Sequence, residues 1–366
     1  MSSLDVFYSR FFLVAAPNNN RFTGGGGSLS STSPGGGSSS LISQLIQHSS
    51  MKNILALFFL PVALPYLMYK FIIAFRKRYG LKMRRLEGKV VVITGASSGI
   101  GESLAKVMYA NGCRLILAAR RVEELERVKA ELVRSKTQYG TVYMPAVVQL
   151  DLGDLKSMEA KSLEILEIYG FVDILINNAG MSYRGTILET NIDVDQRVMM
   201  VNYFGPLALT KNLAHSMVER QCGRVVFISS VQGKIAIPYS FSLLSDDRSS
   251  YTASKHALQA LADSLRAELT DLGIKVTVIS PGYVKTHLSM NAVTGTGHNY
   301  GRMDAATASG HSPDYVAART LRAILGGETD VVICSLMPRI AIFLRNLCPE
   351  VFFWVMANRA RKDSVG

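Results

Sequence analysis

Short apolar runs alternate with helix-like stretches along most of the chain, from Lys89 to the region after residue 330. Seven runs are rich in β-branched residues, and they lie at residues 89–94, 114–118, 146–150, 173–177, 224–229, 275–280 and 330–334. Such runs are typical of strands buried on both faces of a sheet, and the stretches between them provide crossover helices. The pattern predicts an α/β fold with a doubly wound parallel sheet in a single domain.

One connecting helix is visible as a periodic pattern of apolar residues. In VEELERVKAELV, which begins at Val122, the residues Leu125, Val128 and Leu132 fall on one helical face, and charged residues occupy most other positions. We therefore expect these three side chains to belong to the hydrophobic core and to take no direct part in chemistry.

The longest apolar segment precedes the α/β pattern. Residues 54–75 read ILALFFLPVALPYLMYKFIIAF, which at about 1.5 Å per residue is long enough to cross about 30 Å of hydrocarbon. Pro61 and Pro65 would kink this helix, which a membrane tolerates better than water does, and Lys70 can extend to the interface. We predict an N-terminal transmembrane helix over residues 51–77, with a buried soluble helix as the alternative.

The segment before this span is unlike a folded domain. Residues 1–50 contain FTGGGGSLSSTSPGGGSSS, which has too little apolar surface to offset the entropy of the chain. We expect residues 1–50 to be disordered. A weak transit peptide is an alternative interpretation, and Met51 is an alternative start of the natural chain.

Charge and cysteine content argue against two other classes of function. The formal net charge is +12, but six basic residues fall within positions 76–85, directly after the apolar span. This cluster indicates a membrane surface and not nucleic acid, and the positive-inside rule places the following domain on the cytosolic side. The four cysteines form no Cys-x-x-Cys pair, so we expect no metal site.

A glycine-spaced turn, KVVVITGASSGIG, connects the first strand run to the helical pattern ESLAKVMYANG. Gly95, Gly99 and Gly101 would provide the tight turn, the close approach of backbone to a pyrophosphate and close helix packing. The phosphate would lie at the helix N-terminus, where free N–H groups and the helix dipole favour an anion. A plain strand-to-helix turn is the alternative, but the strand and helix on either side favour nucleotide binding.

Tyr251 and Lys255 stand four residues apart in SSYTASKHALQALADSLRAEL, so they share one helical face. A tyrosine with a reference pKa of about 10 is a poor acid or base near neutrality. A lysine ammonium nearby stabilises the phenolate and lowers that pKa. Ser230, which ends the preceding strand run, would hydrogen-bond a carbonyl or hydroxyl and hold its oxygen against the Tyr251 hydroxyl.

Four motifs in a fixed order support a family resemblance. They are TGASSGIG, NNAG at residues 177–180, a serine before Tyr251-x-x-x-Lys255, and PGYVKT at residues 281–286. The chain resembles the classical short-chain dehydrogenase/reductases over residues 86–335, which would form the catalytic domain. The resemblance implies transfer of hydride between a nicotinamide cofactor and a carbonyl or alcohol. Further segments, among them SYRGTI, VNYFGPLALTK and MANRARK, resemble a membrane-anchored member of this family.

The resemblance implies a chemical role for four residues. Tyr251 would be the proton donor or acceptor, and Lys255 would hold the nicotinamide ribose and lower the tyrosine pKa. Ser230 would orient the substrate oxygen. Asn202, in VNYFG, would support a water-linked proton path.

The resemblance also implies a set of residues around the cofactor. Asp151 would contact the adenine, and Thr286 would contact the carboxamide. Apart from Arg120, the set is Thr94, Gly95, Ser97, Ser98, Gly99, Ile100, Gly101, Asp151, Asn178, Ala179, Gly180, Tyr251, Lys255 and Thr286. For Thr94 and Ser97 the alternative is a role in forming the turn, and for Asp151 it is a helix cap.

The choice of cofactor depends on the end of the second strand run. An NAD enzyme usually has an acid there, but this chain reads ILAARRVEE, with Ala119 at that position and Arg120 next. A guanidinium binds a 2′-phosphate through charge-assisted hydrogen bonds, so we predict NADP(H) with Arg120 as a ligand. The alternative is that Arg120 and Arg121 pair with Glu123 and Glu124 at a helix start.

The chain departs from the family pattern between Ser230 and Tyr251. Twenty residues intervene where relatives usually carry a dozen, and the extra ones are about SFSLLSDD, after Tyr239. An insertion of this size costs only about 1 kcal/mol or less in loop entropy, so the fold should survive. The insertion would reshape access to the site or shift Ser230; an error in sequence processing is the alternative.

Two later segments complete the expected organisation. The stretch from Val284 to Gly310 resembles a mobile loop that closes over the substrate, and Ser312-Pro313 then begins another helix. The tail, residues 336–366, is apolar, but Arg339, Arg345 and Pro349 interrupt it, so neither half can span a bilayer. The tail would lie on a bilayer, cover the substrate entrance or pack on the core.

Together these features predict a membrane-anchored oxidoreductase that uses NADP(H) and a lipophilic ketone or alcohol. Acyl or alkyl dihydroxyacetone phosphate, steroids and retinoids are the candidate substrates implied by the resemblance. The alternative is an NADPH-binding regulator or scaffold with weak activity. The expected location is the endoplasmic reticulum membrane, with the peroxisomal membrane as the alternative, and a homo-oligomer is possible.

Overall fold

The structure is a computed structural model that describes residues 64–72, 86–135, 143–236 and 249–364. The chain divides into two units, Met1–Ile72 and Ile73–Gly366. In the first unit, residues 64–72 form a helix whose side chains are exposed. Among the described residues, no helix has both the length and the apolar character that a membrane crossing requires. Most of the predicted 51–77 span, all of segment 1–50 and the insertion before Tyr251 lie outside the described residues.

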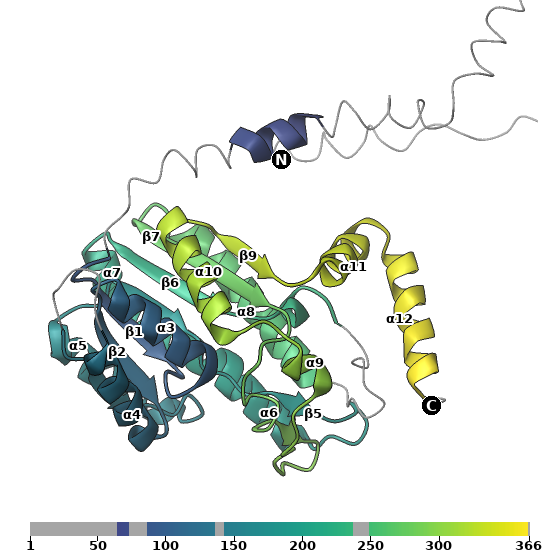
Figure 1. Ribbon diagram of the computed structural model, residues 1–366, viewed down its shortest axis with the longest axis horizontal. Coiled ribbons are helices and arrows are strands. Elements are labelled where there is room, and N and C mark those ends of the chain that lie inside the picture. Colours follow the sequence, from purple (N-terminus) through teal and green to yellow (C-terminus); the bar gives the residue numbers. More distant parts are fainter. Residues whose placement is uncertain (1–63, 73–85, 136–142, 237–248, 365–366) are drawn as a thin grey trace, which may run out of the picture. The chain divides into compact units, whose positions relative to one another are not determined.

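A seven-stranded parallel sheet forms the centre of the second unit (Figure 1). Its strand order is β3-β2-β1-β4-β6-β7-β9. The strands are β1 (Val90–Thr94), β2 (Arg114–Ala119), β3 (Ala146–Gln149), β4 (Ile174–Asn177), β6 (Gly223–Ile228), β7 (Ile274–Pro281) and β9 (Asp330–Ile333). These strands correspond to the seven predicted runs, so the predicted doubly wound sheet is confirmed. The order reverses between β1 and β4, and the carboxyl ends of these two strands are where such sheets bind ligands.

Helices connect the strands and cover both faces of the sheet (Figure 1). They are α3 (Gly99–Ala110), α4 (Val122–Arg134), α5 (Met158–Tyr169), α6 (Ile192–Met199), α7 (Gly205–Glu219), α8 (Ser249–Leu269), α9 (Ala305–Ala308), α10 (Pro313–Gly326), α11 (Leu336–Leu347) and α12 (Pro349–Ser364). Short helical turns η1 (Leu155–Ser157), η2 (Met200–Phe204) and η3 (Val231–Gly233) complete the set.

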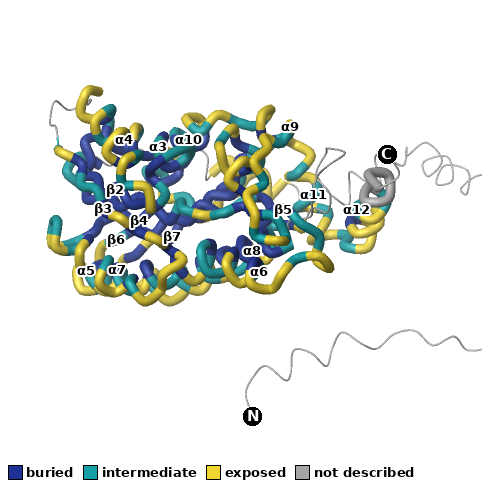
Figure 2. The backbone as a smooth tube through the Cα atoms, turned by 90° about the horizontal axis from the view of Figure 1, so that it is seen from below, coloured by how far each residue is buried: buried dark blue, intermediate teal, exposed yellow. Residues whose placement is uncertain are grey.

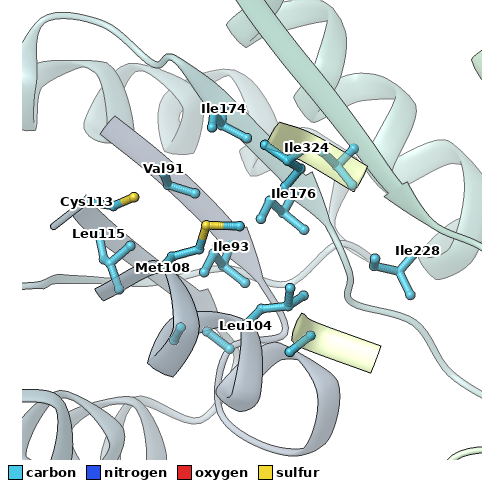
Figure 3. Packing of buried hydrophobic residues seen from close by; sticks show 14 of the residues in the cluster. Val91, Ile93, Leu104, Met108, Cys113, Leu115, Ile174, Ile176, Ile228 and Ile324 are labelled. Atoms are coloured by element: carbon cyan, nitrogen blue, oxygen red, sulfur yellow. The ribbon is translucent and has the colours of Figure 1, made fainter. Parts of the chain in front are cut away.

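The hydrophobic core has two layers because successive side chains of a strand point to opposite faces. On β1, Val91 and Ile93 pack with residues of α3, α4 and α10, whereas Val90 and Val92 pack with residues of α5, α7 and α8. Figure 3 shows the first layer, in which Leu104 and Met108 of α3 and Ile324 of α10 surround these strands. Figure 2 shows buried strands between helices with exposed outer sides.

Two predicted helical features are confirmed. Leu125, Val128 and Leu132 are the buried residues of α4. Helix α10 begins as expected, with Pro313 in its first turn and the Ser312 hydroxyl accepting a hydrogen bond from the Tyr315 N–H at 3.2 Å.

A small second sheet joins the loop after β4 to the loop after β7. Its strands, β5 (Tyr183–Arg184) and β8 (Val293–Thr294), are parallel and have two residues each. Strands of two residues are too short to show an alternation of apolar and polar residues, so the sequence pattern does not predict them. This sheet ties residues 285–310 to the part of the molecule that carries the NNAG motif.

Helices α11 and α12 follow β9 and pack on the segment that follows β6. The side chain of Phe352 in α12 is buried in a cluster with Val231 and Ile235. Val231 directly follows Ser230 in the sequence. One face of the C-terminal helices therefore covers the residues next to the predicted site.

Candidate active site

The glycine-rich turn between β1 and α3 has the backbone that its sequence predicted. Gly95 and Gly99 have φ angles of +67° and +58°, a region that other residues seldom adopt. A β-carbon on Gly101 would lie 2.1 Å from the carbonyl oxygen of Gly95, and one on Gly95 would lie 2.9 Å from the Cα of Ala179. The turn therefore admits no side chain at Gly95 or Gly101. The start of α3 at Ser98–Ile100 is partly buried, and such a turn suits a dinucleotide pyrophosphate.

Thr94 and Asn178 connect the ends of β1 and β4. The Thr94 hydroxyl accepts hydrogen bonds from the backbone N–H groups of Asn178 and Ala179, both at 3.0 Å. The Asn178 amide in turn donates to the carbonyls of Thr94 and Gly95, at 2.9 and 3.3 Å. Both side chains thus hold the glycine turn in position, which agrees with the turn-forming alternative for Thr94.

Arg121, which is not among the predicted cofactor ligands, reaches the glycine turn. The Arg121 guanidinium donates to the hydroxyls of Ser97 and Ser98, at 3.3 and 3.5 Å. Arg120 is exposed, and its backbone carbonyl accepts a hydrogen bond from Gln149. The adjacent arginines at positions 120 and 121 are the sequence feature that could have indicated the contact of Arg121 with the turn. Of the two arginines, Arg121 is the one whose side chain bonds to the serines of the glycine turn.

The alternative pairing at the start of α4 is not formed as expected. Glu124 pairs with Arg127, with 2.9 Å between Nε and Oε2. Arg127 also pairs with Glu102 and Glu131, so it is the centre of this ion-pair group. Arg121 points to the serine hydroxyls of the glycine turn and does not belong to the ion-pair group around Arg127.

At the end of β6, two adjacent serines have different environments. Ser229 is buried; its hydroxyl donates to the carbonyl of Lys255 at 3.4 Å and accepts from the Gln259 amide at 3.1 Å. Ser230 is half-buried, and its hydroxyl oxygen accepts from the Gln232 N–H at 3.1 Å. A β-carbon on Gly233 would lie 2.7 Å from the Lys255 carbonyl, so this glycine permits η3 to pack closely on α8.

Tyr251 and Lys255 lie on the buried face of α8. The Lys255 ammonium is 5.7 Å from the centre of the Tyr251 ring, and it donates to the Ile228 carbonyl at 3.1 Å. Burial lowers the pKa of Lys255 to about 8. The Tyr251 ring packs with Tyr183 and Val293 of the small sheet. The structure therefore brings the predicted lysine to the end of the strand that precedes Ser230, with the predicted tyrosine one helical turn away on the same face.

Asn202 lies in η2, a π-helical turn between α6 and α7. Its side chain is fully buried: the oxygen accepts from the Met181 N–H at 2.8 Å, and the amide donates to the Met181 carbonyl and the Ser254 hydroxyl, both at 3.0 Å. A β-carbon on Gly180 would lie 3.0 Å from the Asn202 oxygen and 3.5 Å from the Lys255 nitrogen. Asn202 thus joins the NNAG loop to α8 beside Lys255, and π-turns of this kind are frequent at functional sites.

The remaining predicted residues lie around the same end of the sheet. Thr286 borders the glycine turn, because a β-carbon on Gly99 would lie 3.1 Å from its methyl group. Asp151 is exposed after β3, and its carboxylate accepts from the Gly153 N–H at 2.9 Å. The cap of η1 is Asp154, so the helix-cap alternative for Asp151 is wrong. Ile100 packs against the core layer that includes α3.

A buried ion pair fixes the loop that follows β7. Arg184 of β5 pairs with Asp304, and their side chains are only 2% and 10% exposed. Arg184 also donates to the Ser182 hydroxyl at 2.6 Å and to the Ser289 hydroxyl at 3.3 Å. The predicted mobile loop is thus anchored to the segment after the NNAG motif. Neither a periodic pattern nor a motif in the sequence indicates this pair.

Comparison with known proteins agrees with this geometry. Residues 89–296 match the family described as short chain dehydrogenase. "Dehydrogenase/reductase SDR family protein 7-like" of Anopheles gambiae is 52% identical over 309 residues, which are 84% of this chain and 94% of that protein. "Dehydrogenase/reductase SDR family member 7B" of Mus musculus is 50% identical over 278 residues, which are 76% of this chain and 83% of that protein.

Solved structures have the same fold. An alcohol dehydrogenase from Thermococcus sibiricus complexed with 5-hydroxy-NADP is 26% identical, with a TM-score of 0.55 over 68% of this chain and 97% of its own. A short chain dehydrogenase/reductase from Burkholderia phymatum in complex with NAD is 24% identical, with a TM-score of 0.61 over 74% and 96%. The neighbours thus include complexes with either nicotinamide dinucleotide. The chain belongs to the short-chain dehydrogenase/reductase family and is close in sequence to the members named 7B.

Proposed function

We propose that this chain is an NADP(H)-dependent oxidoreductase that interconverts lipophilic ketones and alcohols at a membrane. The observation that carries the proposal is the environment of Lys255. Its ammonium bonds to the Ile228 carbonyl, two residues before Ser230, and lies against the Tyr251 ring. A serine, a tyrosine and a lysine around one strand end, beside a dinucleotide-type turn, fit carbonyl reduction.

The side chains of this site have distinct tasks in such a reaction. The nicotinamide cofactor, when bound, supplies or accepts the hydride. In the direction of reduction, the Tyr251 hydroxyl donates a proton to the carbonyl oxygen, and the ammonium of Lys255 stabilises the resulting phenolate. The Ser230 oxygen already accepts a hydrogen bond from Gln232, so its own hydrogen is available to the substrate oxygen.

The preference for NADP(H) is supported by charge at the edge of the glycine turn. The Arg121 guanidinium contacts Ser97 and Ser98, and Arg120 follows the Ala119 position where an NAD enzyme usually has an acid. Two guanidinium groups and a serine hydroxyl suit a 2′-phosphate. A carboxylate, the group that binds the free ribose hydroxyls of NAD, is missing at position 119.

The membrane setting is supported by the sequence before the catalytic domain. Residues 54–75 are long and apolar enough to span a bilayer, and the basic cluster at 76–85 favours a cytosolic catalytic domain. A membrane-anchored site favours substrates that partition into lipid. The candidate classes are acyl or alkyl dihydroxyacetone phosphate, steroids and retinoids, and the endoplasmic reticulum is the expected location ahead of the peroxisome.

A ketone panel tests the proposed function. Full-length protein in detergent is mixed with NADPH and each candidate ketone, and oxidation of NADPH is followed by absorbance. We expect turnover with at least one lipophilic ketone and its loss in Tyr251→Phe, which removes the proton donor but keeps the ring. Turnover that survives unchanged in Tyr251→Phe would contradict the assigned chemistry.

The same experiment distinguishes the proposed oxidoreductase from the second candidate function, an NADPH-binding regulator. The feature that favours this alternative is the eight-residue insertion, SFSLLSDD, between Ser230 and Tyr251. Tight binding of NADPH without turnover on any ketone would favour the regulator.

A further inference from the structure

The C-terminal helices present an apolar surface on their outer side. On α11 the exposed residues Leu336, Ile340, Phe343 and Leu347 follow one another at intervals of four, three and four, which forms one stripe along the helix. The exposed apolar side chains of both helices are Leu336, Met337, Ile340, Phe343, Leu347, Val351, Phe353, Trp354 and Val355. Leu336, Phe343 and Trp354 are 70%, 65% and 67% exposed. Exposed apolar side chains gathered on two adjacent helices indicate a surface that binds another molecule or a membrane.

The opposite side of the same helices is already used for packing. Phe352 is buried with Val231 and Ile235, and Ile342 and Leu344 of α11 pack against this cluster. The helices are therefore fixed to the domain by one face, and their outer apolar faces are not part of its core. Because Val231 follows Ser230, these helices also pack on the segment next to the proposed site.

Positive charge accompanies the apolar surface. The Arg345 guanidinium lies 4.7 Å from the centre of the Phe353 ring. Residues 336–364 contain five basic side chains, Arg339, Arg345, Arg359, Arg361 and Lys362, and two acidic ones, Glu350 and Asp363. Apolar and aromatic residues flanked by arginine and lysine fit the boundary between acyl chains and anionic head groups. A second copy of this chain fits less well, because a two-fold interface would bring the two basic sets together.

We propose that α11 and α12 lie in the interfacial layer of an anionic lipid bilayer. Their outer apolar faces would enter the acyl boundary, and the Arg345 guanidinium beside Phe353 would remain among the head groups. With 12 and 16 residues, they are about 18 and 24 Å long, which is too short to span about 30 Å of hydrocarbon. The inference goes beyond the proposed function, because docking requires neither turnover nor a membrane span at residues 51–77.

The chain contains its own probe for this surface, since Trp354 is its single tryptophan. Full-length protein is placed, one copy per disc, in lipid nanodiscs of phosphatidylserine and phosphatidylcholine brominated on its acyl chains. We expect the Trp354 emission to shift to the blue relative to detergent-free buffer and to be quenched by the bromine. Iodide added to the aqueous phase should not quench it.

Variants show whether the quenching comes from the proposed face. Leu336→Asp/Leu347→Asp should lose the blue shift and the quenching by bromine. The matched control is Leu163→Asp, an exposed leucine of α5, which should leave both signals unchanged. Helix α5 lies at the opposite end of the second unit from α12 (Figures 1 and 2). Binding of NADPH to each variant verifies that it is folded.

Two results would overturn the proposal. The first is a Trp354 that iodide quenches and brominated lipid does not, in wild-type protein held in discs. The second is a blue shift that appears only in discs with two copies, which would make the surface an interface between copies. The fluorescence signal does not depend on activity. Membrane docking can therefore be tested even if no ketone in the panel is reduced.

Discussion

Lys255 has an unfavourable environment for a charged side chain. It is 4% exposed, and burial lowers its pKa from 10.5 to about 8. Because the pKa in the folded state is below the unfolded value, the charged ammonium destabilises the folded protein. This penalty is complete below about pH 8 and disappears as the pH rises toward 10.5. The difference corresponds to roughly 3 kcal/mol.

We predict that Lys255→Met removes this pH dependence. Between pH 8 and 10.5, the wild-type free energy of unfolding should rise relative to that of the variant by up to ~3 kcal/mol. Urea denaturation at several pH values measures the difference. Lys211→Met, which removes an exposed lysine of α7, serves as the control and should follow the wild type. Parallel pH profiles for wild type and Lys255→Met would contradict the burial argument.

The arginine doublet gives a second prediction at the scale of single residues. We expect Arg120→Glu and Arg121→Glu each to raise the KM for NADPH by at least about tenfold while changing the KM for NADH little, because a carboxylate repels a 2′-phosphate. Arg134→Glu, an exposed position at the end of α4, controls for the change in net charge. Equal effects on both cofactors would refute the preference for NADP(H).

At the scale of elements, the sequence patterns predicted most of the framework. The seven strand runs and the amphipathic α4 follow from local apolar periodicity, so each could be found without tertiary information. The small β5–β8 sheet could not, because two-residue strands have no periodicity and depend on packing between distant loops. The same limit applies to Arg121: the doublet was visible, but only the path of the chain after β2 determines which guanidinium reaches Ser97.

The Arg184–Asp304 pair connects elements that are far apart in the sequence, and it leads to a prediction. Because the two side chains are only 2% and 10% exposed, Arg184→Met alone should lower the free energy of unfolding by about 3–5 kcal/mol, since it removes the cation that pairs with the Asp304 carboxylate. The double variant Arg184→Met/Asp304→Leu should recover most of this loss. Denaturation of both variants measures the coupling. Additive losses in the double variant would show that the pair does not hold the loop.

At the scale of the whole molecule, the proposed membrane anchor predicts that the catalytic domain lies on the cytosolic side of the membrane. The basic cluster at residues 76–85 is the physical reason, since such clusters remain on the cytosolic side. In sealed microsomes, added protease should degrade the domain while a lumenal marker protein stays intact. Protection of the domain until detergent is added would reverse the predicted orientation.

The central claim is that this site transfers hydride with Tyr251 as the proton donor. It is tested most directly with NADPH that carries deuterium at both C4 positions of the nicotinamide, full-length protein in lipid, and a ketone that supports turnover. Mass spectrometry of the alcohol should find deuterium on the carbinol carbon, and Tyr251→Phe should lose this transfer at least about a hundredfold while still binding NADPH. Undiminished transfer in Tyr251→Phe, or an alcohol that forms without the label, would contradict the account.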